Sequence, residues 1–257
     1  MNFNLDLFEK NVLITGGAGG IGLSCAKGFL ENGAAVVLCD LSEAALEKAK
    51  EELSSQFPEG KLFTVCGDIT KEEDIQKILD LSEEKLGTLD ILVNNAGVAH
   101  DIYSMFETRE QWGKVLDVNL SAQFFLTQGV FNRFWNKKKG GKVVFMSSLS
   151  AFVAVPSAAA YSASKGAVLQ LTKSLAGEWA RFGVQVNCVC PGFVETPLIE
   201  DQIKNERWMG YMNLRIPAKR LAKPDDITGA VLFLSSHLSD YITGSSIIVD
   251  GGFSACG

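Results

Sequence analysis

The sequence has few of the residues on which several common functions depend. It contains 2 histidines and 6 cysteines in 257 residues, and no two cysteines form a C-x-x-C pair. We therefore expect no metal site and reduced thiols. A basic surplus is also missing, because the formal net charge is -6 at pH 7. That charge argues against a nucleic-acid or anionic membrane partner. The single basic cluster, Lys137, Lys138 and Lys139, is interpreted as a solvated helix end.

Long apolar runs are absent as well. No stretch approaches the roughly 20 apolar residues that a membrane-spanning helix needs. Residues 1–6 lack the cationic start and apolar segment of a secretory signal. Hydrophobic residues make up 47% of the chain and charged residues 21%, which is typical of a folded globular protein. We expect a soluble cytoplasmic protein whose cysteines act as small apolar side chains.

Short apolar runs alternate with segments of helical period along the whole chain. This pattern predicts one α/β domain over residues 1–257, with a doubly wound parallel sheet of seven strands and helices on both faces. The expected strands are 11–14, 35–40, 62–66, 91–94, 142–147, 184–190 and 246–249. The expected helices are 20–31, 43–55, 72–86, 109–136, 160–182 and 225–238.

Two connections are longer than such a domain needs. Residues 98–108 follow the fourth strand and residues 193–224 follow the sixth. Ligands of doubly wound sheets bind beyond the carboxyl ends of the strands, so both connections are candidate pocket walls. The second connection is a candidate substrate lid.

A glycine-rich turn joins the first strand to the first helix. It comprises Thr15, Gly16, Gly20, Ile21 and Gly22, together with the residues between them. Glycines let the backbone approach a pyrophosphate, and the helix N-terminus offers free N–H groups to it. The spacing departs from the G-x-G-x-x-G fingerprint, so a purely structural turn is the alternative.

Asp40 and Leu41 stand at the tip of the second strand, and Asp40 follows Gly22 by 18 residues. A carboxylate in this place accepts hydrogen bonds from the adenine ribose and repels a 2′-phosphate, which favours NAD over NADP. Neither the glycine turn nor the residues just after Asp40 include lysine or arginine. Alternatively, Asp40 is a turn residue or caps the next helix.

Tyr161 and Lys165 lie four residues apart near the start of a predicted helix, so their side chains share one face. An adjacent ammonium favours the phenolate of a tyrosine, which would bring its pKa toward the range that acid/base catalysis requires. Read alone, the pair favours a structural role, because tyrosine and lysine occur at this spacing often by chance.

The ordered set of motifs resembles the short-chain dehydrogenase/reductase family over nearly the whole chain, and so implies a Rossmann fold. The matching segments are Thr15 to Gly22, Asp68-Ile69, Asn95-Ala96-Gly97 within the run from Asn94, Asn119, Ser148 located 13 residues before Tyr161, and Pro191-Gly192 with Val194 and Thr196.

The resemblance implies a nicotinamide-dependent exchange between a secondary alcohol and a ketone. In that mechanism Ser148 positions the substrate oxygen and Tyr161 is the acid/base. Lys165 binds the nicotinamide ribose and lowers the tyrosine pKa, while Asn119 holds a water of the proton relay. Asp68 and Ile69 would contact adenine, Asn95, Ala96 and Gly97 would line the cofactor, and Pro191, Gly192, Val194 and Thr196 would hold the carboxamide.

The substrate is expected to be a small polyol, sugar or hydroxy acid, because the pocket connections are polar with a few aromatics. The candidate contacts are Ser150, His100, Trp208 and Arg215, with Tyr103, Phe152 and Tyr211 nearby in sequence. A 3-oxoacyl-carrier reductase and a non-catalytic NAD-sensing or scaffold protein remain alternatives. By analogy with the family we also expect a homotetramer.

Overall fold

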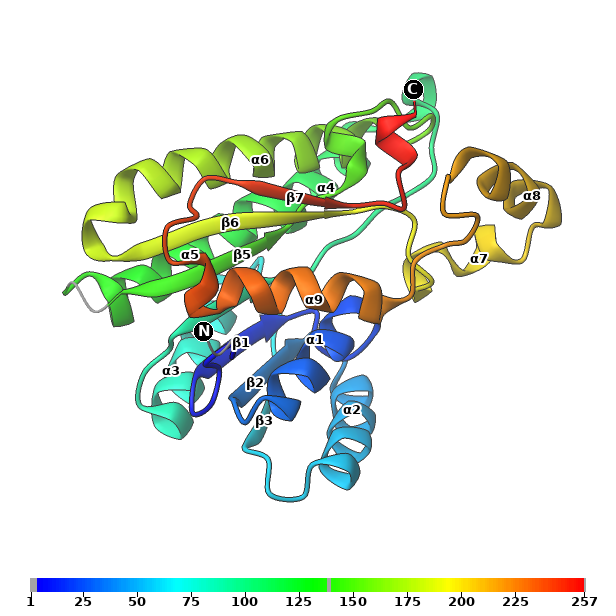
Figure 1. The fold of residues 1–257 in the computed structure, drawn as a ribbon. Helices are drawn as coiled ribbons and strands as arrows, with labels where there is room; N and C mark the ends of the chain where they lie inside the picture. The colour runs from blue at the N-terminus through cyan, green and yellow to red at the C-terminus, as the bar shows by residue number, and fades with distance from the viewer. Residues whose placement is uncertain (1–3, 138–139, 257) are drawn as a thin grey trace.

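Seven parallel strands form the centre of the computed structural model, which describes residues 4–137 and 140–256 (Figure 1). The strand order is β3-β2-β1-β4-β5-β6-β7, so the chain changes direction across the sheet between β1 and β4. The strands are β1 Asn11–Thr15, β2 Ala35–Asp40, β3 Leu62–Cys66, β4 Ile91–Asn94, β5 Gly141–Met146, β6 Val184–Pro191 and β7 Ser246–Val249. This single-domain Rossmann-like sheet confirms the predicted fold class.

Helices cover both faces of the sheet. They are α1 Gly20–Glu31, α2 Glu43–Gln56, α3 Glu72–Leu86, α4 Arg109–Leu116, α5 Gln123–Val130, α6 Ala159–Trp179, α7 Glu200–Ile203, α8 Glu206–Arg215 and α9 Pro224–Ser235. Helices α1, α2 and α9 pack on one face, and α3, α5 and α6 on the other. Within β1, Leu13 joins one core while Val12 and Ile14 join the other. This alternation explains why the strands are apolar on both sides.

The segment expected as one helix over 109–136 is helical from 109 to 135, but its geometry alternates between α and π. Two π-helical turns, Asp117–Ala122 and Phe131–Trp135, flank α5. Such turns insert an extra residue into a helix and are frequent at functional sites. Residue 138 and residue 139 of the basic cluster lie outside the described residues, so its interpretation stays a prediction.

The connection 193–224 holds more structure than a plain loop. It contains α7 and α8, and Asn205 caps α8 by accepting a hydrogen bond from Trp208 N at 3.1 Å. Its two ends are pinned together, because Glu195 N donates to Ala222 O at 2.8 Å and Ala222 N donates to Phe193 O at 2.9 Å. The segment therefore leaves and rejoins the domain through one narrow base.

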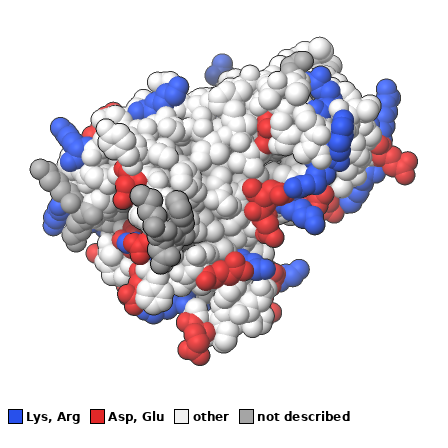
Figure 2. Space-filling view, in the orientation of Figure 1, with Lys and Arg blue, Asp and Glu red and all other residues white. Residues whose placement is uncertain are grey.

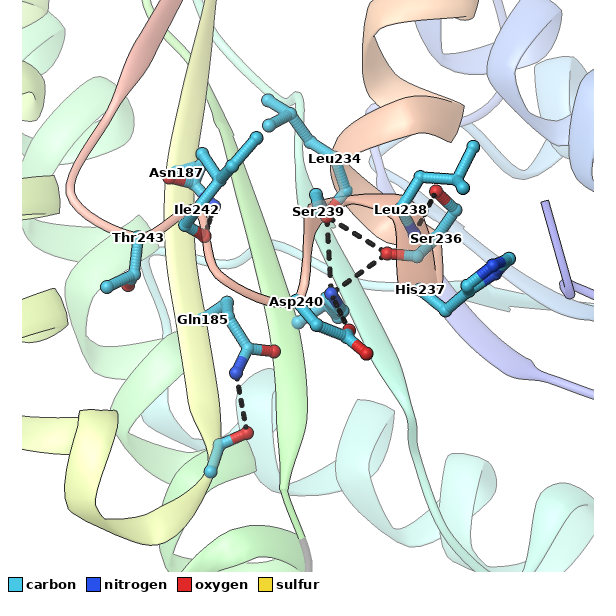
Figure 3. A network of polar contacts seen from close by, with 12 residues as sticks. Gln185, Asn187, Leu234, Ser236, His237, Leu238, Ser239, Asp240, Ile242 and Thr243 are labelled. Atoms are coloured by element: carbon cyan, nitrogen blue, oxygen red, sulfur yellow. Dashed lines mark hydrogen bonds and ion pairs between the residues drawn. The ribbon is translucent and has the colours of Figure 1, made fainter. Parts of the chain in front are cut away.

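A polar network closes the amino-terminal end of the sheet, opposite the expected site. Lys142 Nζ donates to Ser236 O at 2.9 Å, Ser239 Oγ at 3.2 Å and Asp240 Oδ1 at 2.7 Å (Figure 3). Asn187 adds hydrogen bonds to Ile242 O and from Ser245 N. Together these contacts fasten the end of α9 and the entry to β7 onto the central strands.

The six cysteines are all free, and Cys25, Cys39, Cys188 and Cys190 are buried. Over residues 4–137 and 140–256, none of the helices is long and apolar enough to cross a membrane. On the face shown in Figure 2, acidic and basic side chains are interspersed around a large uncharged area.

Candidate active site

The glycine turn folds back on itself so tightly that a side chain cannot be added. A Cβ on Gly22 would lie 2.1 Å from Gly16 O, and a Cβ on Gly16 would lie 2.9 Å from Ala96 Cα. Gly16 and Gly20 also have positive φ angles of +60° and +53°, a region that glycine adopts without strain. The turn therefore requires glycine at these positions.

Hydrogen bonds hold the glycine turn against the residues that follow β4. Asn95 Nδ2 donates to Thr15 O at 3.0 Å and to Gly16 O at 2.9 Å. The buried Thr15 Oγ1 in return accepts from Asn95 N and Ala96 N, both at 3.1 Å. Gln123 Nε2 supports the same segment by donating to Ala96 O at 2.6 Å. These bonds join the predicted cofactor residues at the sheet's switch point.

The first turn of α1 is suited to an anion. Gly19 is the N-cap residue and provides no side-chain cap, and the first turn holds no acidic residue. A Cβ on Gly19 would meet nothing within 4 Å. Free N–H groups facing open space at a helix N-terminus fit a pyrophosphate, so these residues fit a dinucleotide. Ile21 lies in this same turn.

Asp40 has the turn role that was one of its two interpretations, and its contact with the adenine ribose stays a prediction. Its Oδ2 accepts from Ala18 N in the glycine turn at 3.1 Å, and its Oδ1 accepts from Ser42 N at 3.3 Å just before α2. The carboxylate thus helps to form two turns while remaining partly exposed beside Leu41, which is 66% exposed.

Asp68 is held at the end of β3 through its own side chain. Its Oδ1 accepts from Thr70 N at 3.0 Å and from Thr70 Oγ1 at 2.7 Å. Burial acts to raise the pKa of Asp68, but these hydrogen bonds outweigh it and lower that pKa. Ile69 beside it is buried.

The segment after β6 approaches the glycine turn from the other side. A Cβ on Gly20 would lie 3.1 Å from Thr196 Cγ2, and a Cβ on Gly192 would lie 2.8 Å from Asp250 Cα. Val194 is buried and pairs with Ala222. Pro191, Gly192, Val194 and Thr196 thus lie on a segment that flanks the predicted cofactor turn.

Ser148 and Tyr161 meet, although they come from different elements. Ser148 follows β5, and Tyr161 lies in the first turn of α6. Burial raises the pKa of the Tyr161 phenol, while a hydrogen bond with the Ser148 side chain lowers it. Ser148 Oγ also accepts from Ser150 N at 3.1 Å. Because that bond uses a lone pair, the hydroxyl proton of Ser148 is left for the bond with Tyr161 or with a substrate oxygen.

Lys165 lies beneath the tyrosine and is only 3% exposed. Its Nζ donates to Met146 O at 2.8 Å and lies 5.6 Å from the centre of the Tyr161 ring. Burial lowers the pKa of Lys165 to about 8. A Cβ on Gly97 would lie 3.5 Å from this nitrogen, so Gly97 keeps the backbone close to the ammonium.

Asn119 is fully buried in the π-helical turn between α4 and α5. Its Oδ1 accepts from Val98 N at 2.8 Å, and its Nδ2 donates to Val98 O at 2.9 Å and Ser164 Oγ at 3.1 Å. Both amide protons are therefore used by the protein. The side chain positions α6 against the end of β4, and its predicted role in holding a water stays a prediction.

Three of the four predicted substrate residues contact other side chains of the protein, and the fourth has a buried hydroxyl. His100 Nε2 lies 2.6 Å from Glu107 Oε1, and Trp208 packs edge-to-face on Phe193 at 5.6 Å between ring centres. Arg215 lies over the Phe253 ring at 5.3 Å. The Ser150 hydroxyl is buried. Their contacts with a substrate stay predictions.

Several supporting residues carry no sequence signal of their own. Gln123 and Ser164 bond to partners far away in the chain, and Glu107 pairs with His100 seven residues before it. Ser147 is another, because its Oγ donates to Lys165 O at 2.9 Å. Adjacent serines at the end of a strand could have indicated that both serve the site, but the partner of Ser147 is known only from the fold.

Comparison with known proteins agrees with this geometry. A family model described as Enoyl-(Acyl carrier protein) reductase matches residues 16–254. L-rhamnose-1-dehydrogenase of Scheffersomyces stipitis is 34% identical, with 95% of each chain covered. 5-keto-D-gluconate 5-reductase of Escherichia coli is 33% identical, with 98% of each chain covered. The NADP-dependent (R)-specific alcohol dehydrogenase of Lentilactobacillus kefiri is 37% identical, covering 96% of this chain and 97% of its own.

A solved structure extends the agreement to the fold. A short-chain type dehydrogenase/reductase from Mycobacterium marinum superposes with a TM-score of 0.92 at 31% identity over 97% of both chains. The protein belongs to the short-chain dehydrogenase/reductase family. It is an oxidoreductase of the class that interconverts secondary alcohols and ketones.

Proposed function

We propose that this oxidoreductase uses NAD to interconvert a secondary alcohol and a ketone on a small polyol, sugar or hydroxy acid. The observation that carries the proposal is the meeting of Ser148 with Tyr161 above a buried Lys165, beside an uncapped glycine turn. The printed names of the rhamnose and keto-gluconate enzymes support a hydroxylated substrate. Bound nicotinamide would accept or supply the hydride.

Each catalytic side chain has one task in this proposal. Ser148 donates its free hydroxyl proton to the substrate oxygen and holds it in place. Tyr161 gives a proton to that oxygen during reduction and takes one during oxidation. Lys165 supplies positive charge beneath the phenol, which opposes the effect of burial on the Tyr161 pKa. Asn119 fixes the relative position of α6 and the residues after β4.

The choice of NAD rests on Asp40. Its carboxylate bonds to the glycine turn at the end of β2, and in this proposal it would repel the 2′-phosphate of NADP. A relative that is NADP-dependent by name makes this choice a point to test. Two like charges about 4 Å apart repel by about 4 kcal/mol at an effective dielectric constant near 20. Screening by solvent and salt reduces this to the equivalent of about 100-fold in affinity.

The test compares NAD with NADP in wild type and in Asp40→Asn, which keeps the size of the side chain. We expect wild type to prefer NAD, and the variant to gain about 100-fold in kcat/KM for NADP relative to NAD. Asp80→Asn, an exposed site on α3, removes the same charge elsewhere as a control. A wild-type preference for NADP would refute the proposed cofactor.

Turnover is tested at 340 nm with polyols, sugar acids and 3-hydroxyacyl thioesters. Tyr161→Phe should abolish turnover while NADH binding, followed by fluorescence, stays within about twofold. Tyr241→Phe is a matched control, since Tyr241 is fully exposed. Exclusive use of thioesters would favour the carrier-reductase alternative. NADH binding without turnover of any substrate would favour the sensor.

We further propose a cytoplasmic homotetramer. Trp112 on α4 and Phe125 on α5 are 39% and 52% exposed. A Cβ on Gly113 or Gly166 would meet nothing within 4 Å, so α4 and α6 have bare positions that another helix could approach. Free cysteines suit the reducing cytoplasm. Light scattering coupled to size exclusion tests the assembly, with a monomer as the contradicting result.

A further inference from the structure

Exposed apolar side chains gather on the connections that leave the carboxyl ends of β4 and β5. Tyr103, Met105 and Phe106 in the first connection are 61%, 78% and 71% exposed. Phe152, four residues after Ser148, is 47% exposed. Soluble proteins seldom expose several large apolar side chains close together in one segment unless something binds there.

A second apolar surface faces the carboxyl end of β6. Phe193, Trp208 and Phe253 form an edge-to-face cluster with ring centres 5.4 and 5.6 Å apart. Trp208, Tyr211 and Arg215 are spaced so that they lie on one face of α8. Trp208 contacts Phe193 and Arg215 contacts Phe253, so we assign Tyr211 to the same face. We call Phe193, Trp208, Tyr211 and Phe253 the aromatic wall. Tyr211 is its most accessible member at 53% exposed.

Both apolar surfaces belong to segments that are joined to the catalytic or cofactor residues. Ile102 N donates to Ser157 O at 2.9 Å, which ties the first connection to the residues just before Tyr161. The aromatic wall begins at Phe193, directly after Gly192 of the cofactor segment. Figure 1 places α8 and the C-terminal turn beyond the ends of β6 and β7, where the substrate would enter.

Several polar residues of the same segments, among them Asp101, Glu195 and Arg207, are exposed, but three of the predicted substrate contacts have partners or are buried within the protein. His100 is paired with Glu107, whose side chain is only 5% exposed. Arg215 lies over Phe253, and the Ser150 hydroxyl is buried. His100 and Ser150 are therefore less exposed than Tyr103, Met105 and Phe106.

We propose that the substrate carries an alkyl or aryl group beside its reacting carbon, and that this group packs between the aromatic wall and the residues 103–106. This inference rests on the proposed alcohol–ketone reaction and adds to it the chemistry of the neighbouring substituent. The hydroxylated part of the substrate would meet Ser148 and Tyr161, while the apolar part would extend to the mouth.

The experiment measures NADH-dependent reduction of 2-butanone, 2-hexanone and 2-octanone alongside polyols and sugar acids. We expect kcat/KM to rise about fourfold for each added methylene, equivalent to about 0.8 kcal/mol per buried CH₂. Tyr211→Ser should reduce activity on 2-octanone about fivefold and activity on 2-butanone less than twofold. Tyr241→Ser, an exposed tyrosine before β7, is the matched control and should change neither.

The other possible outcomes distinguish failure of the apolar substrate contact from failure of the proposed alcohol–ketone reaction. Turnover of polyols with no gain along the ketone series overturns the apolar contact but leaves the proposed reaction standing. Absence of turnover with every alcohol and ketone overturns both. If Tyr211→Ser changes the molar mass in light scattering and leaves the chain-length dependence intact, the wall is a contact between copies of the chain and the substrate inference fails.

Discussion

Replacing Lys165 by methionine separates the effect of burying an ammonium from its use in catalysis. The side chain is 3% exposed, and burial lowers its pKa from 10.5 to about 8. A shift of this size corresponds to about 3 kcal/mol of destabilisation while the lysine stays protonated. Methionine has a similar length and no charge, so the variant avoids that penalty. Loss of the hydrogen bond to Met146 O offsets about 1 kcal/mol of the gain.

The stability difference between wild type and Lys165→Met depends on pH. Below pH 8 the folded and unfolded chains both hold the proton, and the full penalty is present in wild type. Between pH 8 and 10.5 the folded protein loses the proton first, so wild type gains stability relative to the variant as pH rises. From pH 7 to 9.5 this relative gain amounts to about 2 kcal/mol. Lys165→Met should thus be the more stable protein at pH 7, though inactive, and lose most of that advantage at pH 9.5.

Urea unfolding of both proteins at pH 7 and 9.5 measures the difference directly, because all other titrating groups are shared. Working at or below pH 9.5 keeps Tyr161 protonated, since burial raises its pKa above the ordinary value. Lys173→Met, an exposed position on the same helix, controls for the loss of one positive charge. A free-energy difference that is the same at the two pH values would refute a desolvated Lys165.

Two further predictions concern stability and cofactor affinity. Gly22→Ala should weaken NADH binding by on the order of tenfold or more and destabilise the fold by about 2 kcal/mol, because the new Cβ would lie 2.1 Å from Gly16 O. The control is Gly229→Ala in α9. Its new Cβ would meet nothing within 4 Å, so this variant should be more stable than wild type by up to about 1 kcal/mol. Thermal unfolding measures the stability of both variants and NADH fluorescence measures their cofactor affinity. Equal effects of Gly22→Ala and Gly229→Ala would contradict the close contact at Gly22. Lys142→Met should destabilise by about 1 to 3 kcal/mol with kcat unchanged, whereas Asp240→Asn, whose side chain is 68% exposed, should cost less than about 1 kcal/mol. Urea unfolding ranks the two, and a larger effect at Asp240 would contradict the network's reliance on the buried lysine.

The central strands were predictable because they are buried on both faces. Val12, Leu13 and Ile14 illustrate this, since adjacent residues enter different cores and none can be polar. The helical segment 109–136 was less predictable. Its apolar period continues through the π-helical turn at Asp117–Ala122, where the changed register lets a buried asparagine face Val98 and Ser164. Side-chain periodicity does not reveal an added backbone residue.

For the site, sequence spacing indicated which residues lie close together but not the direction in which the fold shifts each pKa. Ser148 and Tyr161 meet as the motif implies. We predicted that Lys165 lowers the Tyr161 pKa, yet the direction in this structure is upward, because burial of the phenol raises its pKa more than the hydrogen bond with Ser148 lowers it. The pairing of His100 with Glu107 was also missed, since it depends on how the connection after β4 folds.

Desolvation therefore links the stability of this site to its chemistry. Burial raises the pKa of the Tyr161 phenol, which is therefore neutral at pH 7, whereas Lys165, with a pKa of about 8, still holds its proton there. An oxidised nicotinamide would add positive charge near both groups and favour the phenolate. The acid/base pair would then become competent mainly when cofactor is present, which explains why a protein can bury Tyr161 and Lys165 together without holding a permanent phenolate in the empty fold.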